Sequence, residues 1–146
     1  MSNAPTPATL AKRLAAMFYD FLLFGSVLLV VGFISMLAIT SITGTENVAK
    51  GSLYAKLFFI YLLAFGYVFF GWFWTHGGQT LGMRAWKLQV ITFDGHSINW
   101  KQALFRYIYS IISWIPLGAG YLWILFDKNK LAFHDRVSKT AIIFKQ

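Results

Sequence analysis

The sequence predicts an all-α membrane domain with two transmembrane helices, a broken or re-entrant third helical segment, and a small cytoplasmic β-element. Two observations predict this fold class. Hydrophobic residues make up 58% of the chain and charged residues only 12%, whereas a soluble domain carries about 25% charged residues. Residues 21–39 and 57–74 also contain no charge, and such stretches are long enough to cross about 30 Å of hydrocarbon as helices. We expect a single membrane domain over residues 1–146.

The first transmembrane helix is predicted over residues 10–40. Lys12 and Arg13 precede its apolar stretch, as basic residues do in a secretory signal peptide. The stretch is much longer than the roughly 7–15 apolar residues of such a signal, and no A-x-A cleavage site follows it. We therefore expect an uncleaved first span with Asp20 inside the helix.

The second transmembrane helix is predicted over residues 57–75, where the long uncharged stretch ends in Trp74. A polar connection over residues 41–56 separates the two helices and contains the turn-forming sequence Thr-Gly-Thr-Glu-Asn. The sequence therefore predicts two spans joined by a polar, turn-containing connection.

Two β-elements are predicted outside the membrane, a strand or hairpin over residues 86–98 and a short strand over residues 139–145. The first is rich in β-forming residues and contains Asp94-Gly95, a favourable turn pair. The glycine-rich segment 76–82 before it lacks the Lys-Ser/Thr ending of a P-loop and does not match G-x-G-x-x-G. We interpret that segment as an adaptable loop.

The third helical segment is predicted over residues 99–126, with a break at residues 116–120, Pro-Leu-Gly-Ala-Gly. Its first half has one polar face, because polar residues recur at steps of three and four. These residues are Asn99, Gln102, Arg106, Tyr109 and Ser113. A helix surrounded by lipid would not carry this polar stripe. The segment should lie in the interface or turn the stripe toward other helices or water.

The distribution of positive charge favours a third segment that enters and leaves by the same face. The chain has 13 Lys and Arg and a net charge of +8. If the third segment crossed once, these cations would divide six against seven. If it is re-entrant, eleven lie on one side, and the positive-inside bias places both termini in the cytoplasm. Both predicted strands then share a side and can pair. The basic excess is expected to attract anionic lipid headgroups, with no role in nucleic-acid binding.

Asp20 is the strongest candidate for a functional residue. It follows Arg13 by seven residues, so both lie on one helix face about 10 Å apart, which is long for a direct ion pair. Each should therefore have another partner. The candidate charge partners are Arg84, Arg106, His134 and Arg136. Asp20 could titrate or bind a cation inside the membrane, or it could hold helices together at the headgroup boundary; the sequence leaves both open.

No catalytic site, metal site or cofactor site is predicted. The absence of cysteine excludes disulfides, thiolate catalysis and cysteine-based zinc sites. His76, His96 and His134 lack the close spacing of metal ligands, and no nucleophile elbow is present. The segment 134–136, His-Asp-Arg, is interpreted as a solvated or helix-docking turn.

Three motifs in order along the chain resemble those of the RDD family, which is named for an arginine and two aspartates. They are Arg13-Leu14-Ala15-Ala16-Met17-Phe18-Tyr19-Asp20, then Gly78-Gln79-Thr80-Leu81-Gly82-Met83-Arg84 with a strand and Asp94-Gly95 after it, and Leu125-Phe126-Asp127 followed by His134-Asp135-Arg136 and Thr140. The resemblance implies a family charge motif of Arg13, Asp20 and Asp135. It also implies a multi-pass protein of the bacterial cytoplasmic membrane. Met83 with Ala85-Trp86 departs from the family pattern.

Two functions follow from the resemblance and the charges. The family is described as containing candidate transporters of unknown ligands, with some members linked to sodium/proton exchange. A small transporter or ion-exchange component would use Asp20, and at this chain length it would need a homo-oligomer to form a path. The alternative is a membrane adaptor that binds a larger membrane protein through its cytoplasmic sheet and basic face.

Overall fold

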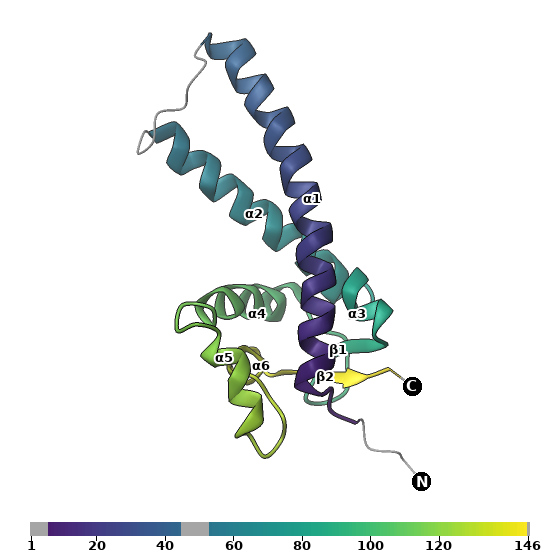
Figure 1. The fold of residues 1–146 in the computed structure, drawn as a ribbon. Helices are drawn as coiled ribbons and strands as arrows, with labels where there is room; N and C mark the ends of the chain where they lie inside the picture. The colour runs from purple at the N-terminus through teal and green to yellow at the C-terminus, as the bar shows by residue number, and fades with distance from the viewer. Residues whose placement is uncertain (1–5, 45–52, 146) are drawn as a thin grey trace.

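Two long helices rise from an α/β unit in the computed structural model, which describes residues 6–44 and 53–145 except the side chain of Thr43 (Figure 1). The helices are α1, Leu10–Thr43, and α2, Leu53–Thr75. They confirm the two predicted helices and extend into the predicted polar connection at both of its ends. The centre of that connection, residues 45–52, lies outside the described residues.

Both long helices have the length and composition of membrane spans. In the most apolar 18-residue stretch of each, none of the α1 residues and 17% of the α2 residues are buried. The core helix of a soluble protein would be mostly buried, so this exposure indicates a membrane protein. At 1.5 Å per residue α1 is about 51 Å long, more than a hydrocarbon core of about 30 Å requires. The excess belongs to its N-terminal end, which packs against the α/β unit.

We call this unit the cap and define it as residues 76–145 together with residues 6–20. Its elements are α3 (Leu81–Ala85), β1 (Leu88–Thr92), α4 (Trp100–Ile112), α5 (Ala119–Leu122), the 3-10 helix η1 (Trp123–Leu125), α6 (Phe133–Ser138) and β2 (Thr140–Phe144). Neither α3 nor α6 was predicted from the sequence. In α3 the Thr80 side chain accepts a hydrogen bond from the backbone N–H of Met83, which stabilises the first turn of this short helix.

The two strands pair antiparallel, with Leu88 opposite Phe144 and Thr92 opposite Thr140, which confirms the predicted pairing. The segment before α1 runs along the other edge of β2, where the Ala8 N–H donates to the Ile142 carbonyl at 2.9 Å. The last strand of the chain is therefore held between the first described residues and β1. Leu88, Val90 and Ala8 are fully buried in the core beneath this sheet.

The third helical segment is broken, as predicted. The 13 residues of α4 span about 20 Å, and a turn at Gly118, with φ of 79°, leads into α5 and η1. Within the polar stripe of α4, Arg106 and Ser113 are buried, whereas Asn99 at the start of the helix is exposed. The opposite face carries apolar side chains that are about 40% exposed. They are Leu104, Phe105, Ile108, Ile111 and Ile112.

The long helices meet near the cap and separate beyond it (Figure 1). Phe24 of α1 packs against Phe69 and Phe70 of α2, with ring centroids 5.1 and 4.9 Å away. A Cβ atom at Gly66 would lie 2.4 Å from the hydroxyl of Tyr107 and 3.1 Å from the Phe24 ring. Glycine at this position therefore allows α1, α2 and α4 to approach one another.

Candidate functional site

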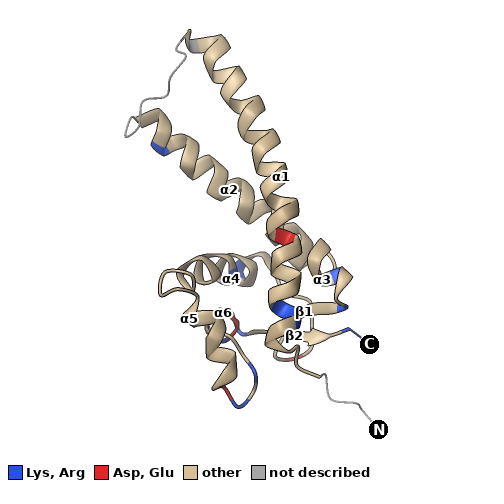
Figure 2. Ribbon diagram, viewed as in Figure 1, with Lys and Arg blue, Asp and Glu red and all other residues tan. Residues whose placement is uncertain are grey.

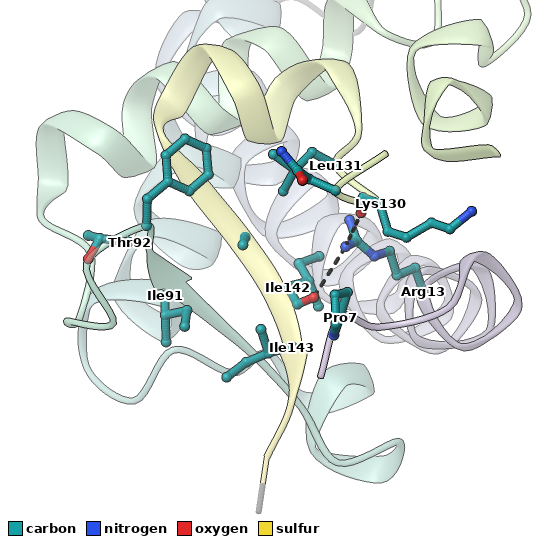
Figure 3. A pocket seen from close by; sticks show the side chains of 11 residues that line it. Pro7, Arg13, Ile91, Thr92, Lys130, Leu131, Ile142 and Ile143 are labelled. Atoms are coloured by element: carbon teal, nitrogen blue, oxygen red, sulfur yellow. Dashed lines mark hydrogen bonds between the residues drawn. The ribbon is translucent and has the colours of Figure 1, made fainter. Parts of the chain in front are cut away.

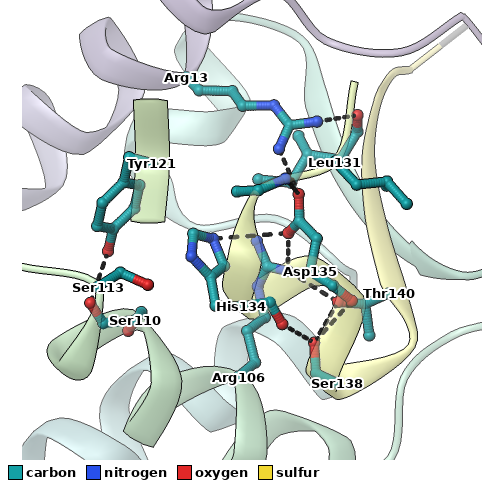
Figure 4. A network of polar contacts seen from close by, with 12 residues as sticks. Arg13, Arg106, Ser110, Ser113, Tyr121, Leu131, His134, Asp135, Ser138 and Thr140 are labelled. Atoms are coloured by element: carbon teal, nitrogen blue, oxygen red, sulfur yellow. Dashed lines mark hydrogen bonds and ion pairs between the residues drawn. The ribbon is translucent and has the colours of Figure 1, made fainter. Parts of the chain in front are cut away.

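Asp135 is the centre of a buried ion cluster that joins three helices (Figure 4). Arg13 of α1 and Arg106 of α4 each donate to one of its carboxylate oxygens at 2.5 Å, and the backbone N–H of Ala132 donates at 3.0 Å. The Asp135 side chain has no exposed surface, and both arginines are buried. Both carboxylate oxygens therefore have cationic partners away from solvent. We call Arg13, Arg106 and Asp135 the charge clamp.

Arg13 also binds the backbone of the cap. Its Nε donates to the Ala8 carbonyl at 3.2 Å, and its Nη2 donates to the carbonyls of Lys130 and Ile142 at 3.0 and 3.2 Å. One guanidinium thus links the start of α1 to the loop before α6 and to β2. These contacts fix the base of the first long helix on the cap.

Arg106 connects the clamp to the start of β2. Its Nη1 donates to the Thr140 hydroxyl at 2.8 Å, and the hydroxyls of Thr140 and Ser138 are 2.7 Å apart. The guanidinium lies 5.4 Å from the ring centroid of Trp74 at the end of α2. Contacts of α1, α2, α4 and α6 therefore converge on this region, where one anion is buried with two cations.

The electrostatics of the clamp favour a permanently ionised carboxylate. Burial alone would raise the pKa of Asp135, but the charges of Arg106 and Arg13 outweigh it and hold that pKa well below its usual range. Burial lowers the pKa of the neighbouring His134 to about 4. Its Nε2 lies 3.6 Å from Asp135, which is too far for a hydrogen bond. His134 is therefore neutral at physiological pH.

The buried neutral state of His134 predicts a pH-dependent stability. Because the pKa is about 4 in the folded chain and about 6.5 when unfolded, unfolding takes up a proton between these values. Stability should be complete above pH 6.5 and fall by about 3 kcal/mol as the pH drops toward 4. Unfolding measured in detergent between pH 7 and 4.5 checks this. This dependence of the free energy of unfolding on pH should vanish in His134→Gln and persist in His96→Gln, since His96 is exposed. If the dependence persists in both variants, the prediction is wrong.

Asp20 lies apart from the clamp and contacts α3. One carboxylate oxygen accepts from the Thr80 hydroxyl at 2.5 Å and the other from the backbone N–H of Gly82 at 2.8 Å. Within the part of the chain that the structure describes, Asp20 forms no ion pair. The prediction that Asp20 and Arg13 have separate partners is confirmed. The prediction that one of four cationic side chains pairs with Asp20 is wrong, because neutral donors of a short helix occupy both oxygens.

The four cationic candidates lie elsewhere. Arg106 and His134 lie beside Asp135, as described above. Arg136 pairs with Asp127, whose carboxylate also accepts from the backbone N–H groups of Leu131 and Asn129. The Leu131 hydrogen bond, followed by the Arg136 contacts, lowers the pKa of Asp127 despite its desolvation. Arg84 is exposed on α3.

The sequence did not single out Thr80, Gly82 or Thr140 as site residues, although each lies within a quoted motif. The sequence could have indicated Thr80 and Gly82, since a threonine directly before Leu81 is a favourable N-cap and predicts the start of a helix there. Thr140 had no comparable signal. Its contact depends on α4 and β2 lying side by side, which neither segment encodes alone.

A hollow of about 250 Å³ lies beside Arg13, between the sheet and the loop before α6 (Figure 3). Its walls are largely apolar and include Ile91, Leu131 and Ile142. Arg13 Nη2 on this side already donates to the backbone carbonyls of Lys130 and Ile142. Across residues 6–44 and 53–145, no group of three His, Asp or Glu side chains is placed to hold a metal ion.

The two exposed apolar helices above a mostly helical cap with one pair of strands are typical of a small membrane protein. The RDD family model matches residues 7–139, so the chain belongs to the RDD family. The resemblance read from the motifs is thereby confirmed, and the matched region contains Arg13, Asp20 and Asp135.

Two bacterial relatives match about half of the chain. The uncharacterized protein YxaI of Bacillus subtilis (strain 168) is 32% identical over 66 residues, which cover 45% of this chain and 43% of that protein. The uncharacterized protein RP437 of Rickettsia prowazekii (strain Madrid E) is 30% identical over 71 residues, covering 49% of this chain and 39% of that protein. The chain thus matches less than half the length of either relative. No solved structure matches it.

Proposed function

We propose that this RDD protein is a non-catalytic membrane adaptor, in which two spans anchor the cap beside a larger membrane protein or a second copy. The saturated carboxylate of Asp135 carries the proposal. A transport residue must exchange its partners during each cycle, whereas Asp135 is fully buried with two arginines and a backbone N–H. Removing the carboxylate would leave two buried guanidinium groups without a countercharge in a dry site. This arrangement is suited to a rigid connection between α1 and the cap.

The proposed setting is the bacterial cytoplasmic membrane, with both termini in the cytoplasm and a third segment that does not cross. The pairing of β1 with β2 supports this, because the chain between Thr92 and Thr140 must leave and return on one side. Eleven of the thirteen cations then lie on that side. A reporter fused after Gln146 should be active only in its cytoplasmic form; activity of a reporter that requires export would contradict this topology.

The inverted amphipathic character of α4 supports a re-entrant position in one leaflet. Arg106 and Ser113 of its polar stripe are buried within the cap, and its apolar face is exposed. The turn that follows exposes Trp114, Ile115 and Leu117, and η1 leads to the exposed Phe126. Apolar surface of this kind is stable when buried in the acyl boundary of a membrane. The backbone of the turn remains hydrogen-bonded to its own chain, as in the donation from Gly118 to Trp114.

One observation favours transport as a second candidate function. Asp20 adjoins the uncharged stretch of α1, and its two contacts in the described chain are with neutral donors. A carboxylate without a countercharge at a membrane boundary can exchange a proton for a cation. In that case the path would run beside α3 and would require an oligomer.

Photo-crosslinking in native membranes tests the adaptor proposal. A photoreactive residue at the exposed α1 positions Leu29 or Phe33, or at Phe59 of α2, should give a discrete adduct with one protein. The adduct should also form in Asp20→Asn, with the exposed Asp94→Asn as the matched control. Two results together would show a transporter instead of an adaptor. The crosslinks would form with lipid alone, and reconstituted vesicles would show a sodium or proton flux that Asp20→Asn abolishes.

A further inference from the structure

Four polar side chains of the cap line a second hollow of about 320 Å³. They are Gln79, Arg84, Lys87 and Lys145. They come from the loop before α3, from α3 itself, from the junction with β1 and from the end of β2. Basic residues can be seen on α3 and near the C-terminal end of the chain in Figure 2. Three positive charges therefore meet around one small space.

Backbone and side-chain contacts hold this hollow in shape. The buried Gln79 donates its side-chain amide to the Leu88 carbonyl at 2.6 Å and accepts at Oε1 from Lys145 Nζ at 3.0 Å. The backbone N–H of Lys145 donates to the Lys87 carbonyl at 2.8 Å. Lys87 has φ of 53°, a left-handed conformation that is uncommon outside glycine and that ends the turn between α3 and β1.

The cations of this hollow have no carboxylate partner in the described chain. The ion pairs of the described residues join Arg13 and Arg106 to Asp135, and Arg136 to Asp127. Asp20, the acid that contacts α3, gives its oxygens to Thr80 and Gly82. Three uncompensated cations around a concave surface produce a strongly positive local potential. Such a potential attracts an anion with several oxygen atoms.

The hollow lies at the depth of lipid headgroups, given the membrane arrangement proposed above. A Cβ atom on Gly82 of α3 would lie 2.1 Å from the Ala16 carbonyl and 2.9 Å from the Asp20 carboxyl carbon, so α3 is level with this part of α1. The uncharged stretch begins directly after Asp20. At about 5.4 Å per helical turn, α3 is within about 10 Å of the hydrocarbon, and the polar layer on each side is about 5–8 Å thick.

The geometry points to a binding site for the phosphate of an anionic lipid headgroup. Arg84 presents a planar guanidinium suited to two phosphate oxygens, and Lys87 and Lys145 add point charges. The four lining residues include no aromatic ring that could stack on a nucleotide base. Lys12 lies over the Trp86 ring at 4.2 Å on the face of α3 toward α1. An amphipathic tryptophan beside a basic residue is typical of the membrane interface.

Lipid titration of the purified full-length protein in detergent, followed by native mass spectrometry, tests this site. The probes are phosphatidylglycerol, phosphatidylcholine with the same acyl chains, and glycerol phosphate as the soluble competitor. The variant Arg84→Gln/Lys87→Gln removes two cations that have no described side-chain partner. The control Lys101→Gln/Lys128→Gln removes the same charge from two exposed positions outside the hollow.

The parent protein should prefer phosphatidylglycerol, and Arg84→Gln/Lys87→Gln should bind it about 30-fold more weakly, at about 1 kcal/mol per cation. The control should retain the preference. Equal weakening in the control, or no headgroup preference in the parent, would overturn the site. Displacement of the lipid by an equal concentration of glycerol phosphate would show a site for soluble phosphates instead. Carbonate extraction separates the two proposals: if the protein leaves the membrane fraction, the membrane arrangement itself is wrong.

Discussion

The substitution Asp135→Asn is expected to lower the free energy of unfolding by about 3–5 kcal/mol. The asparagine keeps the size of the side chain but leaves Arg13 and Arg106 buried without a countercharge. Denaturant unfolding in detergent, followed by circular dichroism, measures the loss. The matched control is Asp94→Asn, because Asp94 is exposed in the turn after β1 and surface changes of this kind usually shift stability by less than about 0.5 kcal/mol.

A double-mutant cycle distinguishes a clamp from a merely buried acid. Arg106→Gln and Asp135→Asn should each be strongly destabilising, and the double variant should lose much less than the sum of both. The coupling exists because Arg106 donates directly to Asp135. If the losses of unfolding free energy are additive, or if Asp135→Asn alone has a small effect, the charge clamp does not stabilise the fold. Either result would contradict the argument on which the adaptor proposal rests.

The substitution Gly82→Ala should detach α3 from α1. Its new Cβ atom would lie 2.1 Å from the backbone carbonyl oxygen of Ala16, which cannot move without bending the long helix. Overpacking of this kind costs about 1–3 kcal/mol, and the hydrogen bond from Gly82 to Asp20 would be lost as well. Hydrogen exchange at the amides of α3 and thermal unfolding of the whole protein measure the two consequences.

Gly77→Ala provides the matched control for this substitution. A Cβ atom on Gly77 meets no atom within 4 Å, so the change should be close to neutral. If Gly82→Ala and Gly77→Ala behave alike, close approach of α3 to α1 is not required for the fold. If only Gly82→Ala exposes the amides of α3, the contact with α1 holds that helix in place.

The sequence was sufficient to predict those elements that depend on a residue pattern within one continuous segment. The uncharged stretches predicted α1 and α2, and a segment rich in β-formers before Asp94-Gly95 predicted β1. The polar stripe predicted that α4 would face inward on one side, and the placement of Arg106 in the clamp is consistent with it. Each of these features depends on the pattern within one segment.

The missed features depend on contacts between distant segments. The helices α3 and α6 have five and six residues, too few to be stable in isolation. Tertiary contacts such as the Asp20 hydrogen bond to Gly82 support α3. The partner of Asp20 was predicted incorrectly because only charged side chains were considered, while a backbone N–H and a hydroxyl satisfy the carboxylate. The pairing of Arg13 with Asp135 spans 122 residues, and no local pattern encodes it.

The placement of β2 between the first described residues and β1 sets an order of events during biosynthesis. Arg13 leaves the ribosome 122 residues before Asp135, which at about 5–20 residues per second corresponds to roughly 6–24 seconds. Throughout that interval the base of α1 lacks β2, the carbonyls of Lys130 and Ile142, and the carboxylate of Asp135. Both long helices are therefore synthesised before residues 130–142, whose carbonyls and carboxylate hold the base of α1 on the cap.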